Sequence, residues 1–276
     1  MSDSLRSLLS QVPAGPAVDW FAAIAERLLA RSTLVVAGKR YRFHELEFYY
    51  HGPAHADSFT HRDPWQQTCA RWYFHRDGGT YRGGTYKGLD ITFGPEGEHG
   101  GILIRSLGSD AGELINGCSL CVDRLLAAAG CNDVASLAGA VEEHPVDTSS
   151  SMLAIVEDPS IPPVEIWRTA RVGLTLKRAA RHPELVDYIA RPYRFLDAPR
   201  KIQKGRLQLV IALHEQGKTP GEIAEISGSP RRVIDGYVAA YEEGRATGEI
   251  ASFIGKALGP SELCRLYGTV ARASGG

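Results

Sequence analysis

The segment YRFHELEFYY, residues 41–50, constrains the fold more than any other stretch of the chain. It is rich in aromatic residues, which favour strands, and a strand places alternate side chains on opposite faces. One face of this strand is expected to carry Tyr41, Phe43, Glu45, Glu47 and Tyr49. The preceding STLVVAG ends in glycine, so the two segments predict a hairpin. Two carboxylates on one strand face are costly to bury, so they need solvent, partners or a function.

Further strands and helices are expected after this hairpin and before it. Residues 18–30 have apolar side chains at helical spacing, and residues 119–130 predict a helix that ends at a glycine. Residues 72–94 have the pattern of two strands joined by a glycine-rich turn. Residues 100–108, GGILIRSLG, form an apolar run that favours a short buried strand. Short strands between helices indicate a mixed α/β (α+β) fold.

The character of the chain changes in its last third. Residues 143–163 contain Pro, Asp and Ser and few apolar anchors, so we expect a linker or a long surface loop there. From about residue 200 onward the pattern predicts three helices with two short breaks, and hence a small all-α C-terminal module. We therefore expect a domain at 1–198 and a helical module at 199–276.

The helical module has the signals of a helix-turn-helix. TPGE at 219–222 has the spacing of a capping box with proline at the first helical position. Ser229-Pro230 repeats the start signal after a break at Ser227-Gly228. In this interpretation the helix that follows would present to DNA the side chains of Arg231, Arg232 and Tyr237. A helical appendage that only packs against the rest of the chain is the alternative.

Composition narrows the class of protein. The chain has 276 residues, 43% of them hydrophobic and 23% charged, as in ordinary globular proteins. No apolar run could span a membrane, and MSDSLRSLLSQV has neither the basic start nor the apolar stretch of a signal peptide. Five cysteines, an odd number, argue against a disulfide framework. We expect a cytoplasmic protein, a monomer without a membrane partner.

The charge is unevenly distributed. The net charge is −1, but residues 164–276 carry 18 Lys and Arg against 12 Asp and Glu. This excess of six positive charges suits a polyanionic partner such as DNA. A solvated helical surface would have the same composition, so charge alone does not decide between the two.

Several short motifs follow the central strand in a fixed order. They are E-x-E-x-Y at 45–49, Gly52-Pro53, His61, L-D-I at 89–91, L-I-R at 103–105, G-C-S-L-C at 117–121, R-V-G-L at 171–174 and R-P-Y-R-F at 191–195. In this order and spacing the chain resembles the alkyladenine (3-methyladenine) DNA glycosylase family over residues 18–196. The resemblance implies a curved antiparallel sheet wrapped by helices, with a pocket on the concave side.

The resemblance also implies roles for single residues. Glu47 matches the catalytic base that activates water, and Arg105 matches the arginine that helps to hold this water. Tyr49 matches an aromatic residue that stacks on the extruded base, and His61 matches the pocket histidine. Asp90 stands where the family has a pocket asparagine. The plainer alternatives are a solvated acidic face paired with Arg42 or Arg62, a loop histidine at 61, and an arginine at 105 that simply pairs with Glu45.

The glycine-rich turn departs from the family pattern. The family has a wedge tyrosine where this chain has Gly83-Gly84, so a wedge is either missing or supplied by Tyr81, Arg82 or Tyr86. We place Tyr81 in the base pocket and expect Arg82, Tyr86 and Lys87 to contact DNA. A phosphate contact is the simpler role for Lys87, and Schiff-base chemistry is the alternative.

These expectations combine into a function. An extruding DNA glycosylase needs a pocket for a flipped nucleotide and a carboxylate beside the sugar. We expect a monofunctional DNA N-glycosylase that acts on double-stranded DNA in the cytoplasm, associated with the nucleoid. Its substrate would be an alkylated purine or a bulkier hypermodified base of the phage type, in repair or anti-phage defence. Cys118 and Cys121 form a single pair, so we expect no metal and no cofactor. A non-catalytic DNA-binding regulator is the alternative.

Overall fold

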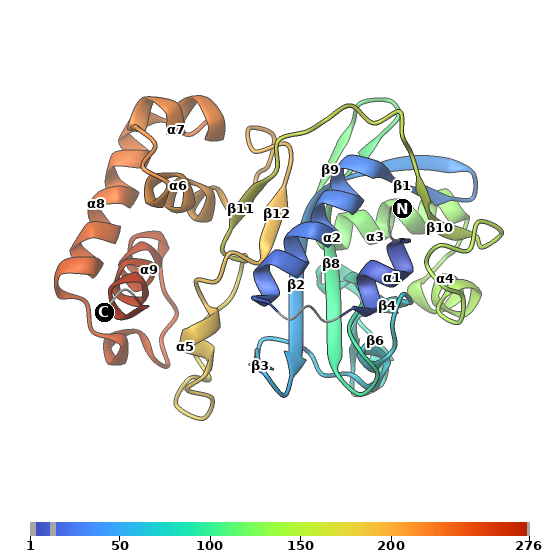
Figure 1. Cartoon of the computed structure of the whole chain (residues 1–276), viewed down its shortest axis with the longest axis horizontal. Coiled ribbons are helices and arrows are strands. Elements are labelled where there is room, and N and C mark those ends of the chain that lie inside the picture. Colours follow the sequence, from blue (N-terminus) through green and yellow to red (C-terminus); the bar gives the residue numbers. More distant parts are fainter. Residues whose placement is uncertain (1–3, 12–14, 275–276) are drawn as a thin grey trace. The chain divides into compact units, whose positions relative to one another are not determined.

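The computed structural model describes residues 4–11 and 15–274. It has the mixed α/β fold that the sequence predicts, with a large antiparallel sheet and helices (Figure 1). The residues form two compact units. The sheet unit comprises Met1–Ala56, Thr60–Ile166 and Phe195–Asp197, and the helical unit comprises Asp57–Phe59, Trp167–Arg194 and Ala198–Gly276.

These units divide the chain differently from the expected boundary at 198/199. Trp167–Arg194 lies in the helical unit because its apolar side chains, including Leu176 and Leu185, belong to the same buried core as the C-terminal helices. Phe195–Asp197 lies in the sheet unit. There the Phe195 ring packs edge-on against Phe48 at 5.2 Å.

The main sheet of the sheet unit is antiparallel throughout its central path. In sheet order its strands are β10 (Leu153–Glu157), β1 (Ser32–Val36), β2 (Lys39–Gly52), β8 (His99–Ser109), β7 (Leu89–Thr92) and β4 (Trp72–Phe74). Additional pairings join β3 (His55–Ala56) and β12 (Arg194–Leu196) to β2, and β9 (Leu114–Asn116) to β8. A separate two-stranded ribbon consists of β5 (Arg76–Asp77) and β6 (Thr80–Tyr81).

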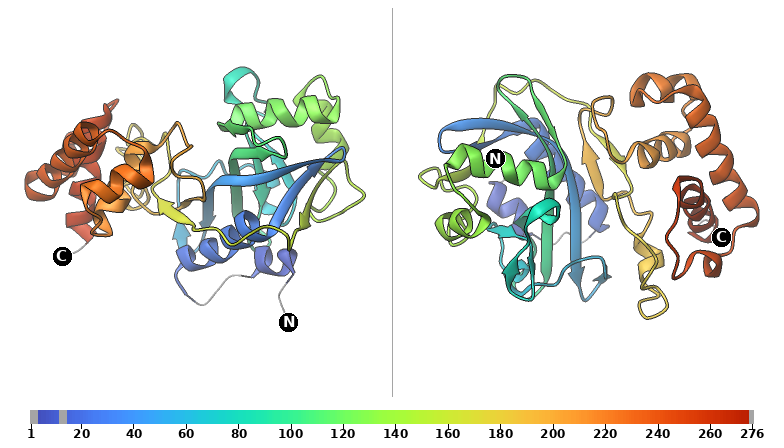
Figure 2. Two further views of the ribbon diagram at one scale, coloured as in Figure 1. Left: turned by 90° about the horizontal axis from the view of Figure 1, so that it is seen from above. Right: turned by 180° about the vertical axis from the view of Figure 1, so that it is seen from behind.

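Helices cover both faces of this sheet (Figure 2). The helices of the sheet unit are α1 (Leu5–Ser10), α2 (Ala17–Arg31), α3 (Cys118–Ala129) and α4 (Val134–Val141), with 3-10 turns η1 (Pro64–Gln67) and η2 (Gly84–Tyr86). The Phe21 ring of α2 stacks on Phe48 of β2 at a centroid distance of 5.0 Å. Helix α3 lies on the other side, where burial and the nearby Glu45 raise the pKa of its Cys121 thiol.

The predicted hairpin is confirmed. Strands β1 and β2 pair antiparallel around Ala37-Gly38, both of which have positive φ. The pairing of β2 with β8 shifts by one residue at Glu45, which faces Ser106, and returns to its earlier register at Leu46. Side chains therefore keep the alternation that the sequence predicts on each side of this irregularity.

One expectation for the sheet unit is wrong. Residues 143–163 were expected to form a linker or surface loop, but they contain β10, which pairs with β1 along five residues. The reason is that Leu153, Ala154 and Ile155 are buried and extend the sheet past the predicted hairpin. The five apolar residues from Met152 to Val156 are enough for a strand when a partner edge is already present.

The helical unit consists mainly of helices at the C-terminal end. Its elements are β11 (Trp167–Thr169), α5 (Leu185–Tyr188), α6 (Arg206–Glu215), α7 (Pro220–Ser227), α8 (Arg231–Thr247), η3 (Ile250–Phe253) and α9 (Pro260–Ser274). The capping box at Thr219 and Glu222 is confirmed, as is the break, where Gly228 is left-handed with φ 66°. Ser229 is not the N-cap of α8, because Pro230 holds that position and makes no side-chain bond.

A buried ion pair helps to hold the helical unit together. Arg171 and Asp57 are both fully buried, and a guanidinium nitrogen lies 2.6 Å from an Asp57 oxygen. The guanidinium also lies 5.4 Å from the ring centroids of Phe59 and Tyr193. This pairing explains why Asp57–Phe59 belongs to the helical unit.

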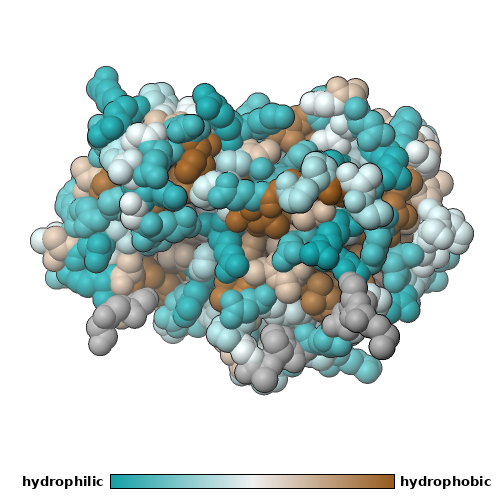
Figure 3. All heavy atoms as spheres, turned by 45° about the horizontal axis from the view of Figure 1, so that its top comes forward, coloured by the Kyte–Doolittle hydropathy of each residue, from teal (hydrophilic) through white to brown (hydrophobic). Residues whose placement is uncertain are grey.

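None of the helices in the described part of the chain combines the length and apolar character that crossing a bilayer requires. Figure 3 shows a face on which hydrophilic residues predominate and hydrophobic residues gather in small groups.

Close contact between α8 and α9 depends on glycine and gives a test of the packing. A methyl group at Gly268 would lie 2.0 Å from the Tyr241 carbonyl oxygen, whereas one at Gly236 would meet nothing within 4 Å. We expect Gly268→Ala to lower the free energy of unfolding by about 1–3 kcal/mol, because backbone must move. Gly236→Ala, the matched control on α8, should raise it by about 0.5–1 kcal/mol. Urea denaturation of the two variants measures both; equal effects would contradict the packing.

Candidate functional site

A row of four side chains crosses the face of the sheet that α2 does not cover. Tyr73 faces Asp90, Asp90 faces Leu103, and Leu103 faces Glu47 across β4, β7, β8 and β2. Residues directly opposite each other in antiparallel strands share a face. Each step is about 5 Å between Cα atoms, so Glu47 and Asp90 lie about 10 Å apart along the row.

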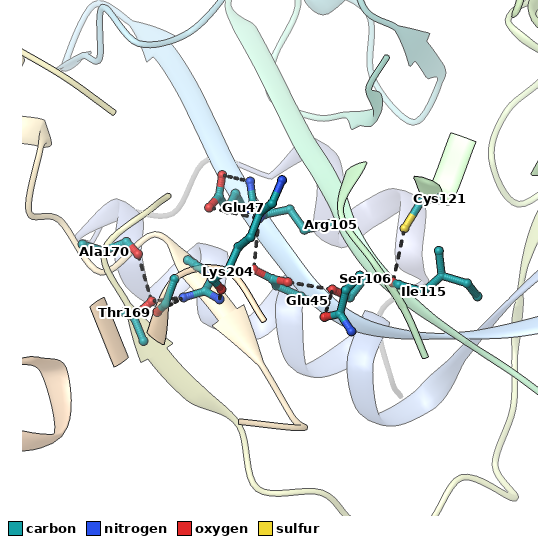
Figure 4. Close-up of polar contacts among 12 residues, drawn as sticks. Glu45, Glu47, Arg105, Ser106, Ile115, Cys121, Thr169, Ala170 and Lys204 are labelled. Atoms are coloured by element: carbon teal, nitrogen blue, oxygen red, sulfur yellow. Dashed lines mark hydrogen bonds and ion pairs between the residues drawn. The ribbon is translucent and has the colours of Figure 1, made fainter. Parts of the chain in front are cut away.

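One end of the row is an ion-pair cluster of two glutamates and one arginine (Figure 4). Arg105 Nε lies 3.0 Å from Glu45 Oε1 and 3.4 Å from Glu47 Oε1. Tyr49 donates its hydroxyl hydrogen to Glu47 Oε2 at 2.8 Å, and Ser106 donates to Glu45 Oε2 at 2.7 Å. The exposed fractions of Glu45 and Glu47 are 3% and 0%. The solvated acidic face is therefore wrong, while the pairing of Arg105 with Glu45 is confirmed and extends to Glu47.

The electrostatics of this cluster favour full ionisation of the arginine. Burial alone would lower the pKa of Arg105, but Glu47 and Glu45 outweigh it, so the pKa is raised well above its usual range. One positive charge thus faces two carboxylates in a buried setting. Such an arrangement holds carboxylate oxygens in fixed positions and tolerates an added positive charge nearby.

The other end of the row is a cluster of rings around Asp90. His75 Nε2 lies 2.7 Å from Asp90 Oδ1, and the His75 ring lies 4.5 Å from His61 and 5.6 Å from Tyr73 between centroids. The Gln66 amide N–H donates a hydrogen bond to Asp90 Oδ2 at 3.4 Å. The structure therefore brings His61 and Asp90 together, as the resemblance implies.

Three members of this cluster, Tyr73, His75 and Gln66, are absent from the sequence-based set of site residues. His75 could have been found, because it lies two positions after Tyr73 in the pattern WYFH and thus shares its face. Gln66 gives no such signal, since it comes from the turn η1 and reaches Asp90 only through the tertiary fold.

The glycine-rich segment separates the candidates that the sequence grouped. The Tyr81 ring lies 4.6 Å from the Arg76 guanidinium, and its hydroxyl donates to Glu142 Oε2 at 3.0 Å. Tyr81 therefore belongs to an ion-pair cluster with Arg76 and Glu142. Tyr86 is 76% exposed at the end of η2, so it is the tyrosine of this segment that projects into solvent.

Two basic residues flank Tyr86. Lys87 Nζ lies 2.9 Å from Asp123 of α3 and also donates to the Gly84 carbonyl. Arg82 lines, with Tyr81 and Tyr86, a surface hollow of about 460 Å³. Asp77, Thr80 and Gly83 complete the lining, so one basic residue, one acidic residue and two aromatic rings border this hollow.

The arginines of the predicted helix-turn-helix lie at the start of α8. Both Arg231 and Arg232 are exposed, and Arg231 Nε lies 2.8 Å from Asp235 one turn later. Tyr237, expected to face DNA, instead packs against the buried core of the helical unit. The reason is its position on the apolar side of α8, beside Ile234 and Tyr241.

Cysteine and histidine side chains do not assemble into a metal-binding group in the part of the chain that the structure describes. Cys121 is buried, and its thiol donates to the Ile115 carbonyl at 3.7 Å (Figure 4). Burial raises the pKa of this thiol, which disfavours the thiolate that a metal would need.

The histidine beside Asp90 provides a pH test. Desolvation and then the neighbouring His75 lower the pKa of His61 to about 4, although part of its surface is exposed. His61 should therefore be neutral at pH 7 and take up a proton only near pH 4. Because an unfolded histidine protonates near pH 6.5, its contribution to stability is complete above pH 6.5 and declines as the pH falls toward 4. Ring carbon NMR signals, assigned with His61→Gln, measure the midpoint, and a midpoint at 6.5 would contradict the packing.

Comparison with known proteins identifies a relative of this chain but no activity. No family model matches the sequence. An uncharacterized protein of Acanthamoeba polyphaga mimivirus, L759, is 30% identical over 206 residues, which cover 69% of this chain and 92% of the viral protein. The chain therefore belongs to the same family as the mimivirus protein L759.

Proposed function

We propose that this protein is a monofunctional DNA N-glycosylase, which extrudes a modified base from the duplex, hydrolyses its N-glycosidic bond and leaves an intact abasic site. The observation that supports it most is the Glu47 carboxylate, buried on the sheet face between Arg105 and the Tyr49 hydroxyl. Buried carboxylates with fixed partners are uncommon in sheets unless they have a function.

The chemistry needs such a carboxylate. As the bond from the base to C1′ breaks, the sugar acquires positive, oxocarbenium-like charge. A carboxylate beside C1′ stabilises that charge and accepts a proton from the attacking water. The water oxygen becomes the C1′ hydroxyl, and the base leaves with the bonding electrons and takes up a proton. In the proposal Glu47 serves this role.

Glu45 has the geometry of a positioning residue. Its two oxygens accept from Arg105 Nε at 3.0 Å and Ser106 at 2.7 Å. These are shorter than the 3.4–3.5 Å from Arg105 to Glu47. Charge-assisted hydrogen bonds of this length hold a side chain firmly. Glu45 would thus fix the guanidinium, and Arg105 would hold water beside Glu47.

Extrusion of a base leaves a gap in the duplex, and Tyr86 is suited to fill it. Its ring is 76% exposed, whereas the Tyr81 ring is occupied by Arg76 and Glu142. An aromatic ring on a short turn can stack between bases at a low cost in conformational freedom. Lys87 and Arg82 next to it would contact phosphates.

The helical unit supplies a second surface suited to DNA. Arg231 and Arg232 lie in the first turn of α8, directly after the Gly228 break of the helix-turn-helix. Exposed arginines at the start of a recognition helix contact phosphates or base edges. With the positive charge of residues 164–276, they support double-stranded DNA as the partner of a monomeric, cytoplasmic and nucleoid-associated protein.

The base is proposed only as a class. Asp90 replaces an amide and, when ionised, presents only acceptors. A methyl group added at Gly83 or Gly84 would meet no other atom within 4 Å, so the space beside these glycines is open. These features suit an alkylated purine or a bulkier hypermodified base of the phage type, in repair or in anti-phage defence.

Replacement of Glu47 tests the reaction. We expect wild type, incubated with alkylated, deaminated and phage-derived DNA, to release a base that mass spectrometry identifies and to create alkali-labile sites. Glu47→Gln removes the negative charge with little change in shape, so release should fall by about 100-fold or more. Glu113→Gln, which changes an exposed glutamate paired with Arg124, should retain full activity.

Three results would count against the proposal. Equal release by wild type and Glu47→Gln would exclude Glu47 as the base. A covalent adduct trapped by borohydride would show a bifunctional enzyme. No release from any of the DNAs, together with tight binding to one sequence, would instead support a DNA-binding regulator that acts through α8.

Replacement of Tyr86 tests the wedge. We expect Tyr86→Ala to slow base release by about tenfold or more, since a stacked aromatic ring contributes roughly 1–3 kcal/mol. Tyr86→Phe keeps the ring and should keep the rate. Met152→Ala, which truncates another exposed apolar side chain, serves as the control. Fluorescence of 2-aminopurine beside the target base reports extrusion, and an unchanged signal in Tyr86→Ala would rule out the wedge.

A further inference from the structure

At the end of the row opposite Glu47, a buried hydrogen-bond acceptor has no partner. Gln66 is 1% exposed, and its Oε1 atom is buried without a hydrogen bond. Tyr73, which lies opposite Asp90 on the neighbouring strand, is fully buried as well. Buried polar atoms are nearly always satisfied in folded proteins, so an exception of this kind points to a missing ligand.

The orientation of Gln66 follows from Asp90. Asp90 accepts from His75 Nε2 at 2.7 Å and from Gln66 Nε2 at 3.4 Å. An ionised carboxylate only accepts, so the Gln66 amide must turn its nitrogen toward Asp90 and its oxygen away. Because the amide contact is long, Asp90 Oδ2 also keeps capacity for another donor. Two acceptors with spare capacity, Gln66 Oε1 and Asp90 Oδ2, thus belong to two side chains that contact each other.

A glycine and three aromatic rings border these polar groups. A methyl group at Gly101 would lie 2.4 Å from Asp90 Oδ2 and 2.6 Å from Gln66 Nε2, so glycine leaves the sheet face to these polar groups. The rings of Tyr73, His75 and His61 stand next to one another at 4.5–6.4 Å, and His61 is exposed. The rings therefore lead from solvent to the acceptors.

Resting on the proposed function, we propose that Gln66 and Asp90 bind the exocyclic amino group of the extruded base, so that the protein selects amine-bearing bases over their oxo counterparts. The Cα atoms of Glu47 and Asp90 lie about 10 Å apart along the row. This distance accommodates a heterocyclic base whose bond to the sugar faces Glu47. An amino group would donate to both acceptors. A carbonyl oxygen in that place has no hydrogen to donate, so this oxygen and Gln66 Oε1 would both stay unpaired, and Asp90 Oδ2 would gain no second donor.

Binding to non-hydrolysable DNA tests this selection. The full chain is titrated with duplexes that carry 2′-fluorinated adenosine, inosine, cytidine or uridine, each opposite a tetrahydrofuran spacer so that no base pair has to break. Fluorescence anisotropy gives the Kd. We expect the adenine and cytosine duplexes to bind at least tenfold tighter than the hypoxanthine and uracil duplexes. Ratios within twofold, or reversed, would overturn the proposal.

Two variants locate the effect. Asp90→Asn keeps the shape but supplies an NH2 donor, so the amine-to-oxo ratio should fall to about one or reverse. Gln66→Met removes the unpaired acceptor at similar size and should also reduce the ratio, which keeps the test open if Asp90→Asn does not fold. Asp133→Asn, at the N-cap of α4, is the matched control and should keep the wild-type ratio. An unchanged ratio in both site variants would overturn the assignment.

The binding ratio needs no base release, so the two proposals can fail separately. Amine selectivity without release from any DNA would contradict the glycosylase reaction and support the acceptor site. Release of a base without amine selectivity would support the reaction and contradict the acceptor site.

Discussion

The ion pairs that Arg105 makes with Glu45 and Glu47 support the rest of this site. Two carboxylates buried on the same strand face would repel each other, and a single guanidinium from β8 pairs with both and reduces that repulsion. The arrangement ties β2 to β8, the pair of strands at the centre of the sheet. The carboxylate that the proposed chemistry needs therefore also takes part in an ion pair that joins two strands of the sheet.

The same face of the sheet divides into two chemical regions. Around Glu47 the groups are charged and held at fixed distances, as expected where positive charge develops in a reaction. Around Asp90 the groups are aromatic rings and buried acceptors, as expected where a flat ligand is recognised. Leu103, an apolar residue, lies between the two regions.

Much of the sheet and part of the site could be predicted from the sequence. Alternation in YRFHELEFYY correctly placed Glu45 and Glu47 on one face, because period two is a local property. Capping signals correctly began α7, since a capping box needs only four residues. Tyr237 packs against the core because it lies on the apolar side of α8, a side that helical spacing indicates. By contrast, β10, the Gln66 contact and the division into units depend on segments that are distant in the sequence. Local patterns carry no information on such pairings.

The register shift at Glu45 has a consequence for how this protein could change. Because the shift is cancelled at the next residue, Phe48 and Tyr50 point toward α2. The irregularity is thus confined to the polar face and leaves the aromatic interior in register. Mutations around Glu45 and Arg105 can re-aim the polar groups without repacking the opposite layer, so descendants of this fold could acquire new specificities while retaining a common hydrophobic foundation.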